Sequence, residues 1–443
     1  MQYLPNILFS IALVAGIGYF TMNIRKIIRN IKLGQEVDAS DNTGQRWSNV
    51  VRIALGQSKM VVRPIPGLLH LFVYIGFVII NIEVLEIIID GIFGTHRIFS
   101  TVLPAGLYNF LIASFEILAL LVLVGVILFW TRRNVQKLQR FWKPEMKGWP
   151  KNDGNFILYF EMILMILFLT MNAADQSLQA LGSAHYVEAG AFPVSKFIVP
   201  FMDGLSEATY IAIERSAWWL HILGILVFLN YLYFSKHLHI ILAFPNVYFG
   251  KVAPKGKFKN LDSVTNEVKM MMDPNADPFA APAEGATETP AKFGASDVMD
   301  LSRIQLLNAY TCTECGRCTS ECPANITGKK LSPRKIMMDT RDRLEEIGKN
   351  IDKNGEFKPD GKQLLDDYIS REELWACTTC NACVEACPVS IDPLSIIMDM
   401  RQYLVMEQSA APTELNVAMT NIENNGAPWP YNQMDRLNWK NEN

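Results

Sequence analysis

The eight cysteines of this sequence form two copies of one spacing pattern. In each copy, three cysteines stand at three-residue intervals, a fourth follows four residues later, and a proline comes directly after it. The two copies are Cys312, Cys315, Cys318, Cys322 and Pro323, and Cys377, Cys380, Cys383, Cys387 and Pro388. Three thiolates at this spacing bind three corners of a [4Fe–4S] cubane, and the fourth cysteine reaches a neighbouring cluster. The pattern therefore predicts two clusters, one held by Cys312, Cys315, Cys318 and Cys387 and the other by Cys377, Cys380, Cys383 and Cys322.

Zinc and disulfide bonds are the alternative uses of these cysteines. Structural zinc takes four ligands in two separated pairs, which does not match two runs that each end before a proline. Disulfides are disfavoured because the membrane topology argued below puts the cysteines in a reducing compartment. Two [4Fe–4S] clusters side by side conduct electrons and form no reaction site of their own.

Four of the six histidines lie within or beside apolar runs and could bind haem iron: His70, His221, His237 and His239. We expect His70 and His239 at the same depth, near the inner ends of two different helices. Paired imidazoles inside a helix bundle hold b-type haem, so we expect one haem b between them, with His237 as the fallback ligand. His221 precedes His239 by five helical turns, about 27 Å, and cannot bind the same iron. The alternative is that each histidine only satisfies a hydrogen bond.

The outer half of the apolar runs holds further ionisable residues. His221 could bind a second haem if His96 or His185 came in beside it, and otherwise a quinone oxygen. Glu83 and Glu86 could pass protons to or from a quinone. The alternative for both carboxylates is that they lie at the membrane interface or pair with hydrogen-bond donors.

Five long apolar runs occupy the first 245 residues of the sequence. They are Ile7–Ile24, Gly67–Ile89, Leu107–Trp130, Phe156–Asn172 and Ala217–Phe234, the last continuing to about Leu242. Each is close to the ~20 residues that a helix needs to cross a bilayer. Basic residues follow the first run and none precedes it, so we expect a retained helix and not a signal peptide. The predicted fold class is mainly α: a five-helix transmembrane bundle followed by an α-helical ferredoxin-like domain.

Basic residues are distributed unequally between the loops that join these runs. The first and third loops hold fifteen: Arg25, Lys26, Arg29, Lys32, Arg46, Arg52, Lys59, Arg63, Arg132, Arg133, Lys137, Arg140, Lys143, Lys147 and Lys151. The two opposite loops hold three: Arg97, Lys196 and Arg215. Because positively charged loops stay inside, we expect a multi-pass protein of the cytoplasmic (inner) membrane. Its N-terminus would lie outside and its iron–sulfur domain in the cytoplasm.

The chain of 443 residues is expected to have four parts. Residues 1–245 form the transmembrane domain in contact with membrane lipid, and 246–298 a flexible cytoplasmic linker. Residues 299–410 form the ferredoxin domain, and 411–443 a C-terminal extension that binds a partner. The chain is 50% hydrophobic and 19% charged, with a net charge of −3, which excludes a disordered or nucleic-acid-binding protein.

These motifs resemble those of a group of membrane oxidoreductases. The five-helix region looks like the cytochrome b (gamma) subunit of respiratory nitrate reductase and, more closely, the membrane subunit of heterodisulfide reductases. That pattern implies two haem-binding histidines on the second helix and two on the fifth. His70, His221 and His239 match it, whereas Ile80 stands at the fourth position. The segments that resemble the iron–sulfur subunit of heterodisulfide reductases are Thr311–Pro323, Lys329–Ile336 and Leu374–Ile391. Asn421–Trp439 resembles the lead-in to their cysteine-rich catalytic module.

The prediction is a membrane-anchored electron-transfer subunit of a quinone-linked oxidoreductase complex. Electrons would pass between a membrane quinone, haem b, two [4Fe–4S] clusters and a cytoplasmic heterodisulfide-reductase-like partner with a cysteine-rich catalytic module. Two alternatives remain open. The chain could be the membrane acceptor for an electron-transfer flavoprotein, or a membrane scaffold whose iron–sulfur clusters are structural. No dinucleotide, hydrolase or phosphate-binding motif indicates a substrate pocket of its own.

Overall fold

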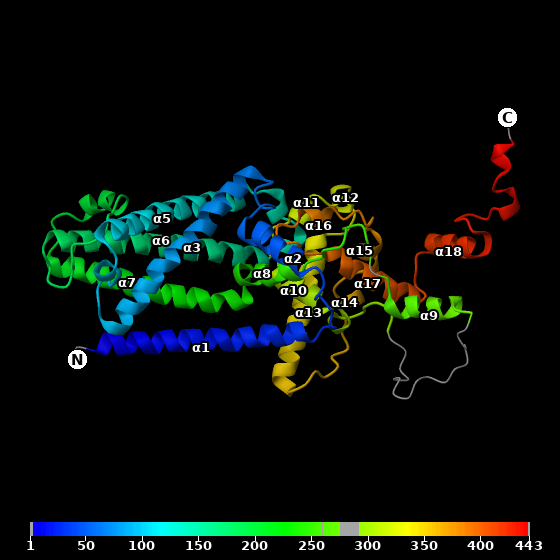
Figure 1. Ribbon diagram of the computed structural model, residues 1–443, viewed down its shortest axis with the longest axis horizontal. Helices are drawn as coiled ribbons and strands as arrows, with labels where there is room; N and C mark the ends of the chain where they lie inside the picture. Colours follow the sequence, from blue (N-terminus) through cyan, green and yellow to red (C-terminus); the bar gives the residue numbers. More distant parts are fainter. Residues whose placement is uncertain (1–2, 259, 275–291, 442–443) are drawn as a thin grey trace.

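The computed structural model describes residues 3–258, 260–274 and 292–441. Within these residues the chain is helical, and its β pairing is confined to the isolated bridges Gln35–Ser302 and Leu365–Ile369. The helices form an elongated bundle with a second helical domain at one end (Figure 1). The predicted fold class is confirmed.

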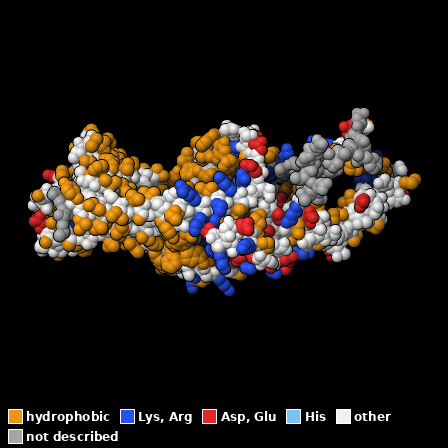
Figure 2. All heavy atoms as spheres, turned by 90° about the horizontal axis from the view of Figure 1, so that it is seen from below, with side chains coloured by type: hydrophobic (Ala, Val, Ile, Leu, Met, Phe, Trp, Pro, Cys, Tyr) orange, Lys and Arg blue, Asp and Glu red, His pale blue; other side chains and the backbone are white. Residues whose placement is uncertain are grey.

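Five helices of the described chain are long and apolar enough to cross a membrane, as the five apolar runs predict. They are α1 (Leu4–Lys32), α3 (Pro64–Phe93), α5 (Ala105–Asn134), α6 (Trp149–Ala180) and α7 (Glu207–Tyr231). Large apolar side chains such as Val14, Phe110 and Ile163 point outward from them. Figure 2 shows this apolar surface over the length of the bundle. Exposure of so large an apolar surface to water costs free energy, so a surface of this kind is typical of a protein in contact with membrane lipid.

Close contacts between helices fix the interior of the bundle. In the described chain α6 packs against α5 and α7, α3 against α5, and α1 against α3 and α7. A Cβ atom at Gly76 of α3 would lie 2.4 Å from Val122 of α5, and one at Gly91 would lie 2.6 Å from the Phe9 ring of α1. Both glycines therefore allow helices to approach where a larger residue would separate them.

The last membrane helix does not continue to Leu242 as expected. α7 passes into a short 3-10 turn over Leu232–Phe234, and Ser235 is extended with φ −107° and ψ 148°. A second 3-10 turn (Lys236–Leu238) then leads into α8 (His239–Phe249). α8 packs against α2 and α10 instead of prolonging α7. The prediction of one continuous helix was wrong, so its five-turn geometry does not relate His221 to His239.

Short elements connect the long helices. On the side of α8 they are α2 (Thr43–Asn49), a π-helical turn (Val50–Leu55) and the 3-10 turns Gln139–Phe141 and Pro144–Met146. On the opposite side they are α4 (Phe99–Val102) and the 3-10 turns Ser195–Phe197 and Val199–Met202. The last two turns pack on α6 at the end of the bundle away from the C-terminal domain.

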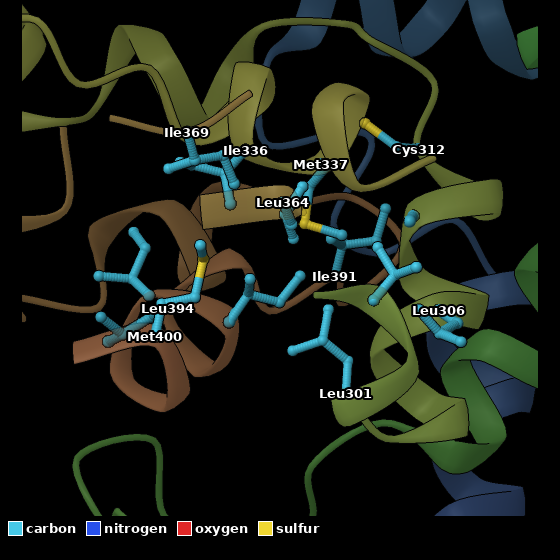
Figure 3. Packing of buried hydrophobic residues seen from close by; sticks show 14 of the residues in the cluster. Leu301, Leu306, Cys312, Ile336, Met337, Leu364, Ile369, Ile391, Leu394 and Met400 are labelled. Atoms are coloured by element: carbon cyan, nitrogen blue, oxygen red, sulfur yellow. The ribbon is translucent and has the colours of Figure 1, made fainter. Parts of the chain in front are cut away.

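The C-terminal domain is built from short helices around one apolar core. The helices are α10 (Arg303–Thr311), α11 (Arg317–Ser320), α12 (Pro323–Ile326), α13 (Pro333–Asn354), α14 (Leu364–Asp367), α15 (Arg371–Trp375), α16 (Ala382–Ala386) and α17 (Pro393–Met406). Ser332 and Asp392 cap α13 and α17 by accepting hydrogen bonds from backbone N–H groups. Figure 3 shows Leu301, Leu306 and Ile336 in the core cluster to which Cys312 also belongs.

The segment expected as a linker, 246–298, includes helical structure among its described residues. It contains the end of α8 and the helix α9 (Asp262–Met272), followed by the 3-10 turn Val298–Asp300, while 275–291 lie outside the described residues. Ala295 and Val298 are buried in the core of the C-terminal domain. Folded structure therefore begins a few residues before the expected boundary at 299.

The C-terminal domain packs directly on the bundle. α1 contacts α10 and α13, and Ile27 of α1 belongs to the same apolar cluster as the C-terminal core. Asn30 donates a hydrogen bond of 3.0 Å to the Tyr310 hydroxyl, and Arg29 pairs with Asp352. Figure 2 shows Lys and Arg side chains gathered where the bundle meets this domain. The two domains thus share a contact surface.

Candidate iron–sulfur and haem sites

The second cysteine motif lines a small cavity together with one cysteine of the first. Cys322, Cys377, Cys380 and Cys383 surround it, and the apolar residues Leu331, Pro333, Leu394 and Ile397 complete the wall. Cys380 is exposed and Cys383 is buried. The four thiols are the ones predicted to share the second cluster.

The other four thiols gather around Cys318. Burial, followed by the neighbouring thiols of Cys315, Cys312 and Cys387 and then by Cys383 of the other group, raises the pKa of Cys318 well above its usual value. Contact between α11 and α16 brings Cys387 to this group from the second motif. Buried thiols ionise with difficulty in apolar surroundings, and iron coordination compensates for that cost.

Both groups suit a cubane better than a single ion. In the described part of the chain no three His, Cys, Asp or Glu residues are placed to share one metal ion. In a [4Fe–4S] cubane each thiolate binds a different iron, so its ligands stand further apart than those of one ion. The residues present therefore fit two clusters.

The two motifs share one backbone conformation. Positive φ values occur at Glu314 and Gly316 in the first motif and at the matching Thr379 and Asn381 in the second. The backbone N–H of Thr379 donates to Cys377 Sγ at 3.4 Å, and that of Ile391 donates to Cys387 Sγ at 3.3 Å. Such N–H donors stabilise negative charge on cluster sulfurs.

A charged triad lies between the first motif and the bundle. Glu314 pairs with both Lys236 and Arg341. Burial acts to raise the pKa of Glu314, but the charges of Lys236 and Arg341 outweigh it and hold that pKa below its usual value. No local sequence pattern points to these three residues, because they lie far apart in the chain.

Three histidines gather at the end of the bundle that carries the C-terminal domain. The rings of His237 and His239 lie 5.5 Å apart, and His239 Nδ1 is 3.1 Å from the Lys236 carbonyl oxygen. Burial, with the neighbouring imidazoles of His239 and His70, lowers the pKa of His237 to about 3. His70 and His239 are likewise close enough for their charges to interact. The structure thus brings the two expected haem ligands into one cluster.

This cluster has features that suit haem ligation. His239 uses Nδ1 for a backbone carbonyl, which orients the ring and leaves Nε2 for iron. His70 Nδ1 is buried without a hydrogen-bond partner among the described residues. His237 Nε2 lies instead 3.6 Å from Glu161 Oε1. The residues present fit one b-type haem between His70 and His239.

His221 lies elsewhere, buried among apolar side chains. Its Nδ1 is 3.0 Å from the Leu164 carbonyl oxygen, and its ring packs against Phe168. His96 and His185 lie against each other, with ring centroids 5.6 Å apart, and His96 pairs with Asp175. His96 and His185 thus lie beside each other and beside Tyr186, and His96 also contacts Asp175.

A cavity of about 430 Å³ opens at the end of the bundle away from the C-terminal domain. Glu83, Glu86 and His185 line it together with Trp218 and Trp219. Glu86 accepts hydrogen bonds from the Phe99 backbone N–H and the Tyr108 hydroxyl, but Glu83 Oε2 is buried without a partner in the described residues. Thirteen residues of α3 separate Glu83 from His70, about 20 Å along the helix axis.

Two other carboxylates of the bundle, Glu116 and Asp175, are paired. Glu116 accepts from Asn172 and from the backbone N–H groups of Val194 and Ser195, which fixes the turns that cover α6. Asp175 binds Arg97 through a 2.6 Å contact. Among these groups, Glu83 is the one whose oxygen is left for a ligand or a proton.

Comparison with protein-family models matches residues 311–391 to the 4Fe-4S dicluster domain. The chain contains a 4Fe–4S dicluster domain. Together with the five apolar helices, this makes it a multi-pass membrane iron–sulfur protein. No solved structure matches the chain.

Several curated proteins are similar over different parts of the chain. The probable iron-sulfur-binding oxidoreductase FadF of Bacillus subtilis is 29% identical over 98% of this chain and 61% of its own length. The EtfAB:quinone oxidoreductase of Syntrophomonas wolfei is 28% identical over 92% of this chain and 55% of its own length. The chain therefore spans less than two thirds of these relatives. One subunit of the ferredoxin/F(420)H(2)-dependent CoB-CoM heterodisulfide reductase of Methanosarcina acetivorans is 30% identical over 26% of this chain and 58% of its own length.

Proposed function

We propose that this chain is a membrane-anchored electron-transfer subunit that exchanges electrons between a membrane quinone and a cytoplasmic redox partner. The carriers would be two [4Fe–4S] clusters and one haem b, which supply one-electron transfer when bound. The observation that carries this proposal is spatial: two groups of four cysteines gather at the end of the bundle where His70 and His239 also lie.

The chain's own residues give the carriers a fixed order. Cys312, Cys315, Cys318 and Cys387 would hold the first cluster, on the side of the bundle, where Arg317 donates to the backbone oxygens of Lys59 and Met60. Cys377, Cys380, Cys383 and Cys322 would hold the second cluster. Exposure of Cys380 gives a soluble partner access to that second site.

The proposed orientation follows the charge asymmetry of the loops. The basic first and third loops lie on the side of the C-terminal domain, so that domain and the clusters would face the cytoplasm. The N-terminus and the outer cavity would face the opposite side of the inner membrane.

The outer cavity is the proposed quinone site. Trp218 and Trp219 offer aromatic surfaces to a quinone ring, and the unpaired oxygen of Glu83 offers a group for proton exchange. His221, one helical turn from Trp218, remains a proposed ligand for a second haem or a quinone oxygen. Buried Ile80, at the position of the fourth histidine in the family pattern, supplies no ligand for that second haem.

Two classes of cytoplasmic partner are supported by different relatives. Similarity to a heterodisulfide reductase subunit supports a partner with a cysteine-rich catalytic module. Similarity over 92% of the chain to an EtfAB:quinone oxidoreductase supports an electron-transfer flavoprotein. Reduction of the purified chain by each class of protein distinguishes them. The C-terminal extension is a proposed binding surface for either partner.

Optical spectra and metal analysis of the purified full chain test the proposed carriers. We expect about nine irons per chain, four for each cubane and one for the haem, and a b-type haem band in the reduced-minus-oxidised spectrum. His70→Ala and His239→Ala should each remove that band, whereas the outer His185→Ala should keep it. Zinc in place of iron would contradict the cluster proposal. A haem band that is unchanged in both His70→Ala and His239→Ala would contradict the proposed haem site. A purified chain without haem would favour the alternative of a membrane scaffold with structural clusters.

A further inference from the structure

The two cysteine motifs have the same spacing and backbone shape but different charges. The first reads Cys-Thr-Glu-Cys-Gly-Arg-Cys and the second Cys-Thr-Thr-Cys-Asn-Ala-Cys. Arg317 of the first motif thus corresponds to Ala382 of the second, and Glu314 corresponds to Thr379. The repeat provides an internal comparison, because the ligand geometry is shared and the neighbouring charges are not.

Arg317 is buried beside the first motif with only 5% of its surface exposed. Its guanidinium donates to the backbone oxygens of Lys59 and Met60, at 3.0 and 3.1 Å, and to no carboxylate of the described chain. Its charge interacts with the thiols of Cys315 and Cys387. A buried cation thus faces this site with its charge uncompensated.

Two further cations reach the same site from the bundle's loops. The Lys59 ammonium donates to the Cys387 carbonyl oxygen at 3.3 Å. Arg140 is coupled electrostatically to Cys315, and its Nε is buried without a hydrogen-bond partner in the described residues. Gly316 makes this approach possible, since a Cβ at this position of φ 72° would lie 3.3 Å from the Arg140 Cβ.

The acidic residues around the first site do not cancel these charges. Glu145 is paired with Arg334 at 2.6 Å. Glu314 is shared between Lys236 and Arg341, and these two cations also pair with Asp153 and Asp342, so Glu314 is not free to neutralise Arg317. The first site therefore lies in a cationic environment formed by three loops and two domains.

The second site has a more balanced environment. Arg401 donates to the carbonyl oxygens of Cys377 and Leu374, at 2.5 and 2.6 Å. The negative charge of Asp392 acts on the Cys383 thiol and opposes the positive charge of Arg401. Cys380 is exposed, so water screens charges there more than at the first site.

We propose that Arg317, Arg140 and Lys59 raise the reduction potential of the first cluster above that of the second. Each cluster takes up one electron, from its 2+ to its 1+ form, without making or breaking a bond. Nearby cations stabilise that added negative charge, most strongly where burial lowers the effective dielectric constant. An electron that enters at the exposed second cluster is therefore drawn to the cluster beside the bundle. This inference rests on the proposed function in one respect, the assignment of the eight cysteines to two clusters.

Redox titration monitored by electron paramagnetic resonance tests this inference on the full chain with both clusters assembled. Dithionite serves as the reductant. In Arg317→Gln, the reduced-to-oxidised ratio of one cluster at a fixed potential should fall about tenfold, which corresponds to 59 mV for one electron. The other cluster should keep its midpoint. Lys59→Gln should shift the same cluster in the same direction, and it replaces Arg317→Gln if that variant does not assemble.

Ala382→Arg is the matched variant, because it places the same charge at the corresponding position of the second motif. It should raise the midpoint of the cluster that Arg317→Gln leaves unchanged. Equal shifts of both clusters in Arg317→Gln and Lys59→Gln, or no shift of either, would overturn the inference. Fewer than two cubanes in the unaltered chain would instead contradict the proposed function itself.

Discussion

Cys322 and Cys387 are the residues that connect the two motifs. Each ends its own motif in sequence but lies with the first three cysteines of the other motif in space. The proline after each cysteine starts a new structural segment, α12 after Cys322 and an irregular turn after Cys387. Neither proposed cluster can therefore assemble on one motif alone, so the two sites should form cooperatively with the domain.

Each motif supplies its fourth cysteine to the site of the other motif. This arrangement predicts which cysteine variants should lose the same cluster. Cys322→Ala removes a thiol from the site of Cys377, Cys380 and Cys383, so the second cluster should be lost or reduced in iron content. Its resonance spectrum should match that of Cys377→Ala and differ from that of Cys312→Ala. Ser320→Ala, two residues earlier, is the control and should keep both clusters. A Cys322→Ala spectrum like that of Cys312→Ala would show that each motif binds its own cluster.

The break between α7 and α8 is the element that positions His239. Asp153, buried near the start of α6, accepts hydrogen bonds of 2.6 Å from both the Tyr231 and Ser235 hydroxyls. It also accepts the Lys236 backbone N–H at 3.1 Å. One carboxylate thus satisfies the polar groups that the end of α7 exposes and turns the chain into α8, where His239 joins His70.

Asp153→Ala should loosen this turn. Buried donors left unsatisfied cost about 1–3 kcal/mol, so we expect a lower midpoint of thermal unfolding. The proposed haem should be bound more weakly, which titration of the b-type band measures. Asn152→Ala, at an exposed neighbouring position, is the control and should change neither property. Unchanged stability and haem content in Asp153→Ala would contradict the positioning role.

At the scale of the whole molecule, the basic loops have two uses. They give the charge asymmetry expected of the cytoplasmic side, and they also dock the iron–sulfur domain. Lys26 and Arg29 pair with Asp352, and Arg63 pairs with Glu321. Outside these loops, Lys236 after α7 pairs with Glu314. Ion pairs at an interface fix register and orientation more than they add affinity. They should therefore hold the clusters at a constant place below the bundle.

The C-terminal extension contrasts with this docked domain. Helix α18 (Thr413–Asn425) buries none of its residues against the described chain, and Figure 1 shows it beyond the cysteine domain. Val417, Ile422, Trp429 and Met434 are exposed along the extension. An exposed apolar segment of this kind is typical of a binding surface.

Removal of residues 411–443 should therefore slow electron transfer from the partner protein and leave the clusters and the haem in place. We expect unchanged iron content, haem content and thermal stability, because the extension adds nothing to the described core. Reduction of the clusters by a reduced partner protein should slow at least tenfold, whereas reduction by dithionite should not change. Stopped-flow absorbance measures both rates. Equal slowing with both reductants would contradict a role in partner binding.

The amino-acid sequence alone determined the elements and the chemistry of this protein. Five apolar runs predict five helices and two cysteine motifs predict two clusters, because both signals lie in contiguous residues. Only the tertiary structure decided which groups are partners. It separates Glu116, which is fully paired, from Glu83, which is not, and it ends α7 at an acceptor, Asp153, some eighty residues away in sequence. It also surrounds one of two matching motifs with uncompensated cations from distant loops. Such contacts depend on how helices pack, and no local spacing encodes them.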